Sequence, residues 1–403
     1  MSPPLGRGAP RAVPHAPRAR PWLRPPVLRT QAAGESDERH ASWLELFFDL
    51  VFVVAVAELA QELSRNHSLG GFAIFAGLFL PVFIAWQGFT FYADRFDSDD
   101  VLFRAVMLAA MLAIAALAVQ IPDVAAGRHD AGFVGAYVTL RSLLIALYLR
   151  AWPHAAAARP LIARYACGYS LSVALWLCSL LVDEPVRYVL WGVGLAIEYA
   201  MPVLAQRIHA RIPVDPGHVP ERFALFTIIV LGESVVAVAL GTAHNEWRLA
   251  SATTAALGFV CVACLWWVYF DRGMAGGLSS RTGSMQIYTR IHIPLLGALT
   301  AVGAGVHMLI QEAATGAAQA GAAWALDGGA ALYLLCLTIA QNVTERGADA
   351  RAARALTGLA LVVLAALVGT LTPVSFVACS AAALIALVVY EIRLGLAEQL
   401  ASP

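Results

Sequence analysis

The chain has 403 residues, of which 60% are apolar and only 13% are charged, and its mean hydropathy is +0.70. Soluble domains average roughly 45–50% apolar and about 25% charged residues, so this composition excludes an ordinary water-soluble protein. Acidic and basic residues number 27 each, which gives a formal net charge of zero. No basic tract lies outside the N-terminal tail, and we therefore expect no nucleic-acid partner.

Residues 1–41 are rich in Pro and Arg and lack the apolar stretch of a secretory signal, so we expect a disordered cytoplasmic tail. Beyond this tail, apolar runs of about 20 residues follow one another, each long enough to cross a hydrocarbon core about 30 Å thick. The sequence predicts an all-α, polytopic bundle of about twelve transmembrane helices. Their predicted ranges are 43–63, 70–92, 101–121, 131–150, 161–182, 186–206, 221–242, 250–270, 286–312, 321–342, 353–371 and 374–397.

The distribution of arginine predicts the orientation of these spans, because cytoplasmic loops retain basic residues. All 27 basic residues are arginine. With the N-terminus inside, 22 of them fall in inner segments, and Arg141 lies within a span. The outer loops hold only Arg65, Arg128, Arg187 and Arg248. This asymmetry predicts twelve crossings with both termini in the cytoplasm.

The chain also repeats itself weakly. Leu46–Val56 in the first span aligns with Val230–Leu240 in the seventh, and this alignment places Asp49 on Glu233. Spans 2 and 8 both end in a Tyr-x-Asp-Arg run. We therefore predict two six-helix halves, 42–212 and 213–403, related by an axis along the membrane normal, as in some transporters.

Charged side chains inside the predicted spans are candidate functional residues, because a charge within the bilayer is costly. The candidates for a proton or ion pathway are Glu45, Asp49, Arg141, Glu198, Glu233 and His292, with Glu58 as a further acid within a span. One arginine cannot neutralise this surplus of acids. We expect Arg141 to pair with Glu198 or Glu233, and the remaining acids to be protonated, to bind a cation or to contact water. The alternative is that they are neutral, structural hydrogen-bonding groups.

Other chemistry-bearing residues carry weaker signals. His292 and His307 lie in one span about 22 Å apart along its axis, so they cannot share a metal. The acids of residues 94–100 are expected to form a solvated loop that pairs with Arg95 and Arg104. The six cysteines all fall within apolar spans, and one Cys261-x-x-Cys264 lacks the second pair of a zinc site. We expect no metal and no cofactor, and no nucleotide-binding or hydrolase motif is present.

Several motifs resemble those of the bacterial low temperature requirement A family of membrane proteins. They are LELFFDLVFVV at Leu44–Val54, YADRFDSDD at Tyr92–Asp100, Tyr137-x-x-x-Arg141, ERFALFTIIVLGESV at Glu221–Val235, WWVYFD at Trp266–Asp271, and His292. The resemblance covers roughly residues 38–395. It implies a multi-pass protein of the bacterial cytoplasmic membrane, and it singles out Glu45, Asp49, Arg141, Glu233 and His292. It implies no established activity or substrate.

Three functions remain open. The first is a secondary transporter or an ion or proton pathway for an unknown solute, in which Asp49 and Glu233 approach each other and share one proton between the halves. The second is a membrane enzyme acting on lipid, although no nucleophile and base pair is visible. The third is a non-transporting stress-adaptation component. Acids that meet at mid-membrane around a cavity favour transport, whereas acids at the inner surface beside a lipid-sized groove favour the enzyme.

Overall fold

The computed structural model describes residues 22–29, 41–128, 130–206, 212, 217–243, 248–272, 283–314, 316–341 and 350–401. The helices of the first half are α1 (Trp43–Arg65), α2 (Leu69–Arg95), α3 (Val101–Ala125), α4 (Asp130–Ala151), α5 (Arg159–Cys178) and α6 (Val186–Leu204). Those of the second half are α8 (His218–Ala243), α9 (Leu249–Arg272), α10 (Ser284–Glu312), α11 (Ala320–Ala323), α12 (Gly329–Ala340), α13 (Arg351–Ala366) and α14 (Pro373–Ala401). A π-helical turn, η3 (Trp324–Gly328), joins α11 to α12, and three short 3-10 turns are η1 (Ala156–Ala158), η2 (Ser179–Leu181) and η4 (Val368–Thr370).

A helix lies over each of the twelve predicted spans. Among the described residues, nine helical segments are long and apolar enough to cross a membrane. The helices α1, α6 and α13 are not among these nine; α1 carries four acids and α13 has only 16 residues. The multi-pass helical class is therefore confirmed, while the count of twelve crossings stays a prediction.

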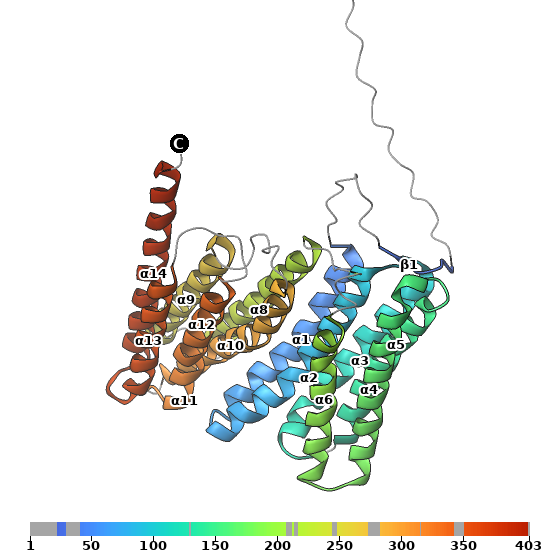
Figure 1. Cartoon of the computed structure of the whole chain (residues 1–403). Coiled ribbons are helices and arrows are strands. Elements are labelled where there is room, and N and C mark those ends of the chain that lie inside the picture. The colour runs from blue at the N-terminus through green and yellow to red at the C-terminus, as the bar shows by residue number, and fades with distance from the viewer. Residues whose placement is uncertain are drawn as a thin grey trace, which may run out of the picture.

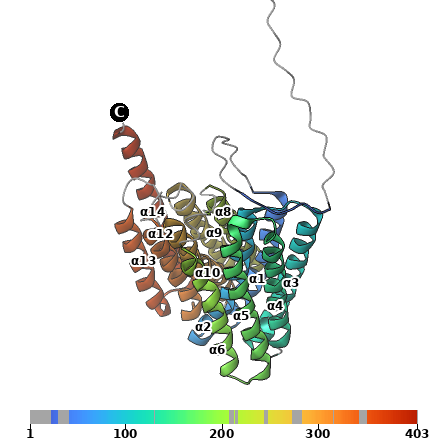
Figure 2. The same cartoon turned by 45° about the vertical axis from the view of Figure 1, so that its right-hand side comes forward.

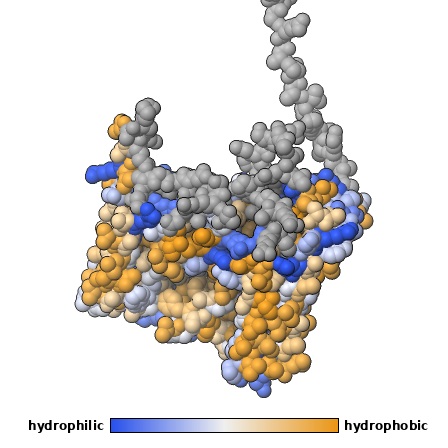
Figure 3. Space-filling model, viewed as in Figure 1, coloured by the Kyte–Doolittle hydropathy of each residue, from blue (hydrophilic) through white to orange (hydrophobic). Residues whose placement is uncertain are grey.

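The surface matches a lipid environment. Large apolar side chains point outward along the helices, and Leu112 and Val119 of α3 are more than 70% exposed. Figure 3 shows apolar residues over the sides of the helices and hydrophilic residues gathered toward the upper face. Both β1 and the end of α14 lie on that upper face (Figure 1), which fits an even number of crossings.

The helices form two adjacent groups, with α1 and α2 crossing obliquely between them (Figure 1 and Figure 2). In the first half, α1 packs on α2 and α3, α3 on α4, α4 on α5, and α5 on α6. The second half has the same order of neighbours, with α8 on α9 and α10, α10 on α12, α12 on α13, and α13 on α14. Helix α1 also packs on α8 and α10, so it joins the two groups. The two groups differ in other contacts, because α9 packs extensively on α14 whereas α2 contacts α6 only slightly, so the six-plus-six repeat stays a prediction.

Helix α10 is the core of the second group because small residues let neighbouring backbones approach it. A Cβ at Gly303 would lie 2.7 Å from Ser234 Oγ of α8, and one at Gly305 would lie 2.4 Å from the backbone nitrogen of Leu326. Larger residues at either position would separate α10 from α8 or from the π-helical turn.

Part of the N-terminal tail differs from the expectation of disorder. Val27–Leu28 form strand β1, which pairs antiparallel with strand β2 at Phe96–Asp97. The backbone N–H of Arg24 donates to Asp100 Oδ2 at 2.7 Å, and Arg29 pairs with Asp97 at 3.2 Å. These contacts attach residues 22–29 to the loop after α2; the rest of residues 1–40 lie outside the described residues.

The acidic loop after α2 is less solvated than the sequence suggests. Asp99 does pair with Arg104, at 2.9 Å, but Asp94 and Asp100 are buried. Asp100 is the N-cap of α3, where it accepts from the backbone N–H of Phe103 at 2.8 Å, and its side chain also pairs with Arg150. The loop is therefore a structural junction between the tail, α3 and α4.

The contacts of the Asp100 carboxyl lead us to expect that the free energy of unfolding depends on pH. Burial acts to raise the pKa of its carboxyl, but hydrogen bonds from Phe103, Arg24 and Arg150 to the charged form lower that pKa overall. A carboxyl with a lowered folded pKa stabilises the protein above its unfolded pKa of about 3.9, and the contribution is lost as the pH falls through the folded value. Asp100→Asn should cost about 1.5–3 kcal/mol at pH 7, and the difference from wild type should shrink below about pH 4.

The measurement is thermal unfolding in detergent across this pH range. Asp123→Asn is the matched control, because Asp123 forms an exposed pair with Arg128 and such pairs contribute little. If the unfolding temperatures of the wild type and Asp100→Asn differ by the same amount at every pH, the charge of Asp100 does not stabilise the protein.

The predicted topology can be tested by labelling single cysteines in a background that lacks the six native ones. Cysteines at Asn66 and Arg248, in predicted outer loops, should react with an impermeant reagent in intact cells. A cysteine at His154, in a predicted inner loop, should react only after the membrane is opened. Labelling of residue 66 or 248 only from the inside would contradict the twelve-span arrangement.

Candidate functional site

Two acids on α1 begin the site. Glu45 and Asp49 are one turn apart, so both face the same side of the helix, and both are buried. Glu45 also completes a capping box, in which its carboxylate accepts from Ser42 N at 2.8 Å and Ser42 Oγ accepts from Glu45 N at 3.3 Å. The start of α1 therefore fixes the position of one of the two carboxylates.

Arg222 on α8 meets both of these acids. Its Nε donates to Asp49 Oδ2 at 3.0 Å, its Nη2 donates to Asp49 Oδ1, and its Nη1 lies 3.1 Å from Glu45 Oε1. From α2, Trp86 Nε1 donates to Asp49 Oδ1 at 2.6 Å. Three helices from the two predicted halves therefore converge on the Asp49 carboxylate.

His218 extends the cluster by one helical turn. It precedes Arg222 by four residues on α8 and is buried. Its Nδ1 lies 3.1 Å from Asp94 Oδ1 on α2, and its Nε2 lies 3.6 Å from Glu45 Oε1 on α1. The imidazole therefore stands between two carboxylates from different helices.

We call these five side chains the junction cluster: Glu45, Asp49, Asp94, His218 and Arg222. All are less than 5% exposed. Their helical positions put them near the end of the bundle that carries β1 and β2. With ionised acids, the cluster holds three negative charges against one guanidinium and one titratable imidazole.

His292 lies beside the junction cluster, although it is not part of it. Its ring is 4.7 Å from that of Phe223, the residue after Arg222. Because Nδ1 faces the carbonyl oxygen of Tyr288 at 2.7 Å, it must donate, and Nε2 accepts from the Tyr269 hydroxyl at 2.9 Å. Both ring nitrogens are satisfied in the neutral form, and this arrangement ties α10 to α9.

A second buried charge site lies within the first half. Arg141 of α4 pairs with Glu198 of α6, one of the two partners expected for it, and both side chains are fully buried. The Tyr137 hydroxyl donates to Glu198 Oε2 at 2.8 Å and accepts from Arg141. The guanidinium also stacks over the rings of Tyr137 and Tyr169, at 4.9 and 5.2 Å. These contacts are internal to the first half.

Glu233 does not meet Asp49. It lies eleven residues after Arg222 on α8, about 16 Å along the axis, and it interacts electrostatically with Glu58 of α1 instead. Helices α1 and α8 run parallel, so residues further along one meet residues further along the other. The alignment of Asp49 with Glu233 does not bring the two carboxyls together, and the expectation of one shared proton between them was wrong.

Sequence reasoning missed three members of the junction cluster. The distribution of arginine places Arg222 in an inner loop, the acidic run 94–100 predicts a solvated loop that includes Asp94, and no motif indicates His218. The available signal was spacing: His218 and Arg222 are four residues apart, as are Glu45 and Asp49, so each pair presents two ionisable groups on one helical face. Arg354, also counted as a loop residue, is buried and pairs with Glu391 at 2.7 Å.

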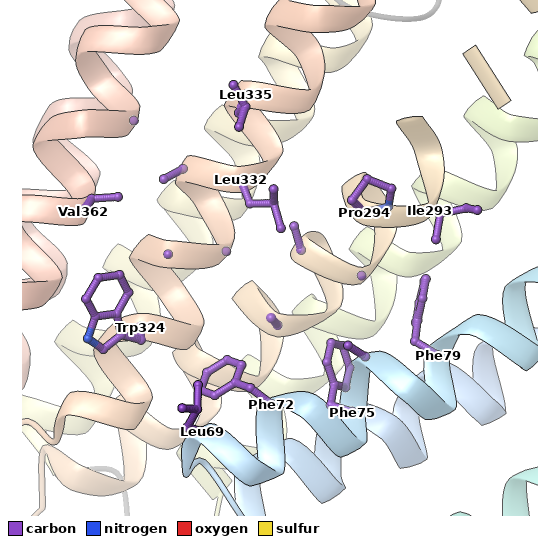
Figure 4. A pocket seen from close by; sticks show the side chains of 18 of the residues that line it. Leu69, Phe72, Phe75, Phe79, Ile293, Pro294, Trp324, Leu332, Leu335 and Val362 are labelled. Carbon is purple, nitrogen blue, oxygen red and sulfur yellow. The ribbon is translucent and has the colours of Figure 1, made fainter. Parts of the chain in front are cut away.

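An apolar groove of about 1260 Å³ opens between the two groups of helices. Figure 4 shows Phe72, Phe75 and Phe79 of α2 along one side and Trp324 and Leu332 along the other. Ile293 and Pro294 of α10 also line it. The polar members of the lining are His67, Thr338 and Arg354. The groove is therefore suited to an apolar chain.

The pairing of Arg141 with Glu198 can be tested by combining two substitutions and measuring the unfolding midpoint. Arg141→Ala leaves a buried carboxylate without its partner, which typically costs about 3–5 kcal/mol, so the unfolding midpoint should fall. Adding Glu198→Gln should restore part of the loss because the orphan charge is removed. Arg128→Ala, which breaks an exposed pair, serves as the control and should change the midpoint little. Strict additivity of the two substitutions would contradict the pairing.

Comparison with known proteins agrees with the resemblance seen in the sequence motifs. The sequence model of the bacterial low temperature requirement A protein (LtrA) family matches residues 40–390, which include every helix described above up to most of α14. The chain is also 29% identical over 289 residues to an uncharacterized protein, RA0937, of Rhizobium meliloti (strain 1021), an alignment that covers 66% of this chain and 69% of that protein. The chain is a multi-pass membrane protein that belongs to the low temperature requirement A family.

Proposed function

We propose that the protein is a secondary transporter or an ion or proton pathway of the bacterial cytoplasmic membrane, and that the junction cluster binds the proton or cation. The observation that carries the proposal is the burial of five ionisable side chains where α1, α2 and α8 meet. Burying such groups is costly, and intramembrane ionisable residues commonly mark ion pathways and proton relays.

The charges of the cluster support uptake of a positive species. His218 stands between Asp94 and Glu45, so a proton on the imidazole would face a carboxylate on either side. Protonation there places a positive charge between these two carboxylates. An imidazole is also the side chain whose ordinary pKa is closest to neutral pH.

The location of the cluster links binding to movement. Arg222 belongs to the second half, and its partners Glu45 and Asp49 belong to the first. Movement of one half against the other, as in alternating access, would have to lengthen these bonds. Protonation of either acid weakens them, so the protonation state biases the arrangement of the halves. The matching order of neighbours in the two halves supports such a rigid-body movement.

Proton flux in liposomes tests this proposal. Purified protein is placed in vesicles loaded with a pH-sensitive dye, a membrane potential is imposed with a potassium ionophore, and the internal pH is followed. Amino acids, sugars, organic anions and metal cations are then added one class at a time. The wild type should change the internal pH faster than empty vesicles, alone or with one class, and His218→Gln should slow this change at least about tenfold, which corresponds to about 1.4 kcal/mol.

Asp123→Asn, in an exposed outer pair, should transport as the wild type does. The unfolding midpoint of each variant shows whether the fold is intact. Wild-type vesicles that match empty ones for every solute class, or a folded His218→Gln variant with normal flux, would refute the proposal.

A second candidate function, binding or modification of a lipid, is favoured by the apolar groove. Its volume and lining suit an acyl chain, and Phe83 and Trp86 lie between its Phe79 wall and Asp49. The acids meet nearer one surface than mid-membrane, which also agrees with this candidate. Modification of a lipid would need a nucleophile paired with a base, and the described residues contain no such pair. Binding of a lipid is therefore better supported than its modification.

A tryptophan substitution separates the two candidates. Gly77 lines the groove, and Gly135 lies on α4 outside it; a Cβ at either position meets nothing within 4 Å. If the groove holds a lipid chain, Gly77→Trp should reduce the phospholipid that copurifies, measured by native mass spectrometry, and Gly135→Trp should not. Equal lipid retention by both variants would remove the support for this second function.

A further inference from the structure

A carboxyl that belongs to neither charge site lies in the second half. Asp327 is in the π-helical turn η3 between α11 and α12, and it is completely buried. Isolated π-helical turns within helices often mark functional sites. Trp324 and Gly328, on either side of Asp327 in the same turn, line the apolar groove, whereas Asp327 does not.

The surroundings of Asp327 offer no charge partner. Within the part of the chain that the structure describes, neither carboxyl oxygen has a hydrogen-bond partner at normal geometry, and the Ser380 hydroxyl is the side-chain donor close enough to act on the carboxyl. The polar side chains that face it are Ser380 of α14, whose hydroxyl donates to the Phe376 carbonyl oxygen, and Cys261 of α9. Helix α10 presents Gly305 to this turn.

Helix α13, which packs on this turn, carries two described arginines near its start, of which Arg351 is exposed and Arg354 is buried. Arg354 is bonded to Glu391, and it lies about 15 Å from Asp327 along the helix axes. On α12, the Tyr333 hydroxyl donates to the Leu265 carbonyl oxygen. Among the described residues, no three His, Cys, Asp or Glu side chains gather around Asp327 as metal ligands.

An ionised carboxylate in an apolar interior without a partner is so costly that the group takes up a proton instead. From its burial and the absence of a facing cation, we infer that Asp327 is a second proton-binding site, which holds its proton in this conformation. It lies seven residues from the start of α11, about 10 Å from that end of the bundle, whereas the junction cluster lies toward the opposite end. The inference does not depend on whether the junction cluster transports anything.

Infrared spectroscopy of the full-length protein in lipid nanodiscs tests this inference. A protonated carboxyl gives a C=O stretching band that an ionised carboxylate lacks, and the band shifts in deuterated water. At neutral pH, Asp327→Asn should remove intensity from this band and leave the unfolding midpoint close to that of the wild type, because a neutral amide replaces a neutral acid. Asp49→Asn is the matched control: it should lower the midpoint by leaving Arg222 short of a partner, without removing C=O intensity.

If Asp327→Asn does not fold, Asp327→Glu provides the second measurement, because a protonated glutamic acid in the same place should move the band rather than remove it. Loss or movement of the band supports the proton-binding site. A C=O band that neither variant alters at neutral pH would mean that Asp327 is ionised, and it would overturn the inference.

Discussion

The contact on which the arrangement of the two halves depends is that of Arg222 with Glu45 and Asp49. A guanidinium inside a membrane must be neutralised, and this one is held by two carboxylates one helical turn apart. Two attachment points on one helix fix both the rotation and the axial register of α8 against α1. Trp86 then positions α2 on the same carboxylate, so a single ionic group sets the relative placement of three helices.

The same rule explains two further buried arginines. Arg141 and Glu198 join α4 to α6, and Arg354 and Glu391 join α13 to α14. Each group of helices therefore carries an internal arginine–glutamate pair that holds its last helix, while the junction cluster joins the two groups. Asp327 does not follow this rule, because no arginine among the described residues pairs with it. A neutral, protonated side chain fits its apolar surroundings.

The sequence was sufficient for the helices and insufficient for their partners. Apolar length and the breaks between runs placed every span within a few residues of a helix, because hydropathy depends on local composition. The pairing of Arg222 and Arg354 depends instead on how each helix is rotated about its axis. Both arginines lie within the first turns of their helices, so a count of loop arginines assigned them to the cytoplasm. Strand β1 was missed because two residues in a Pro/Arg-rich tail carry no alternating pattern.

Helix α2 connects the two features that bear on function. Its first half lines the groove through Phe72, Phe75 and Phe79, and its second half supplies Trp86 and Asp94 to the junction. The rings of Phe79, Phe83 and Trp86 follow one another at 6.1 and 5.6 Å, and Trp86 also stacks on Phe226 of α8 at 4.4 Å. If α2 tilts as one rigid helix to widen the groove, Trp86 moves relative to Asp49. A ligand that favours one tilt would change the proton affinity of the cluster, and protonation would change the affinity for that ligand by the same factor.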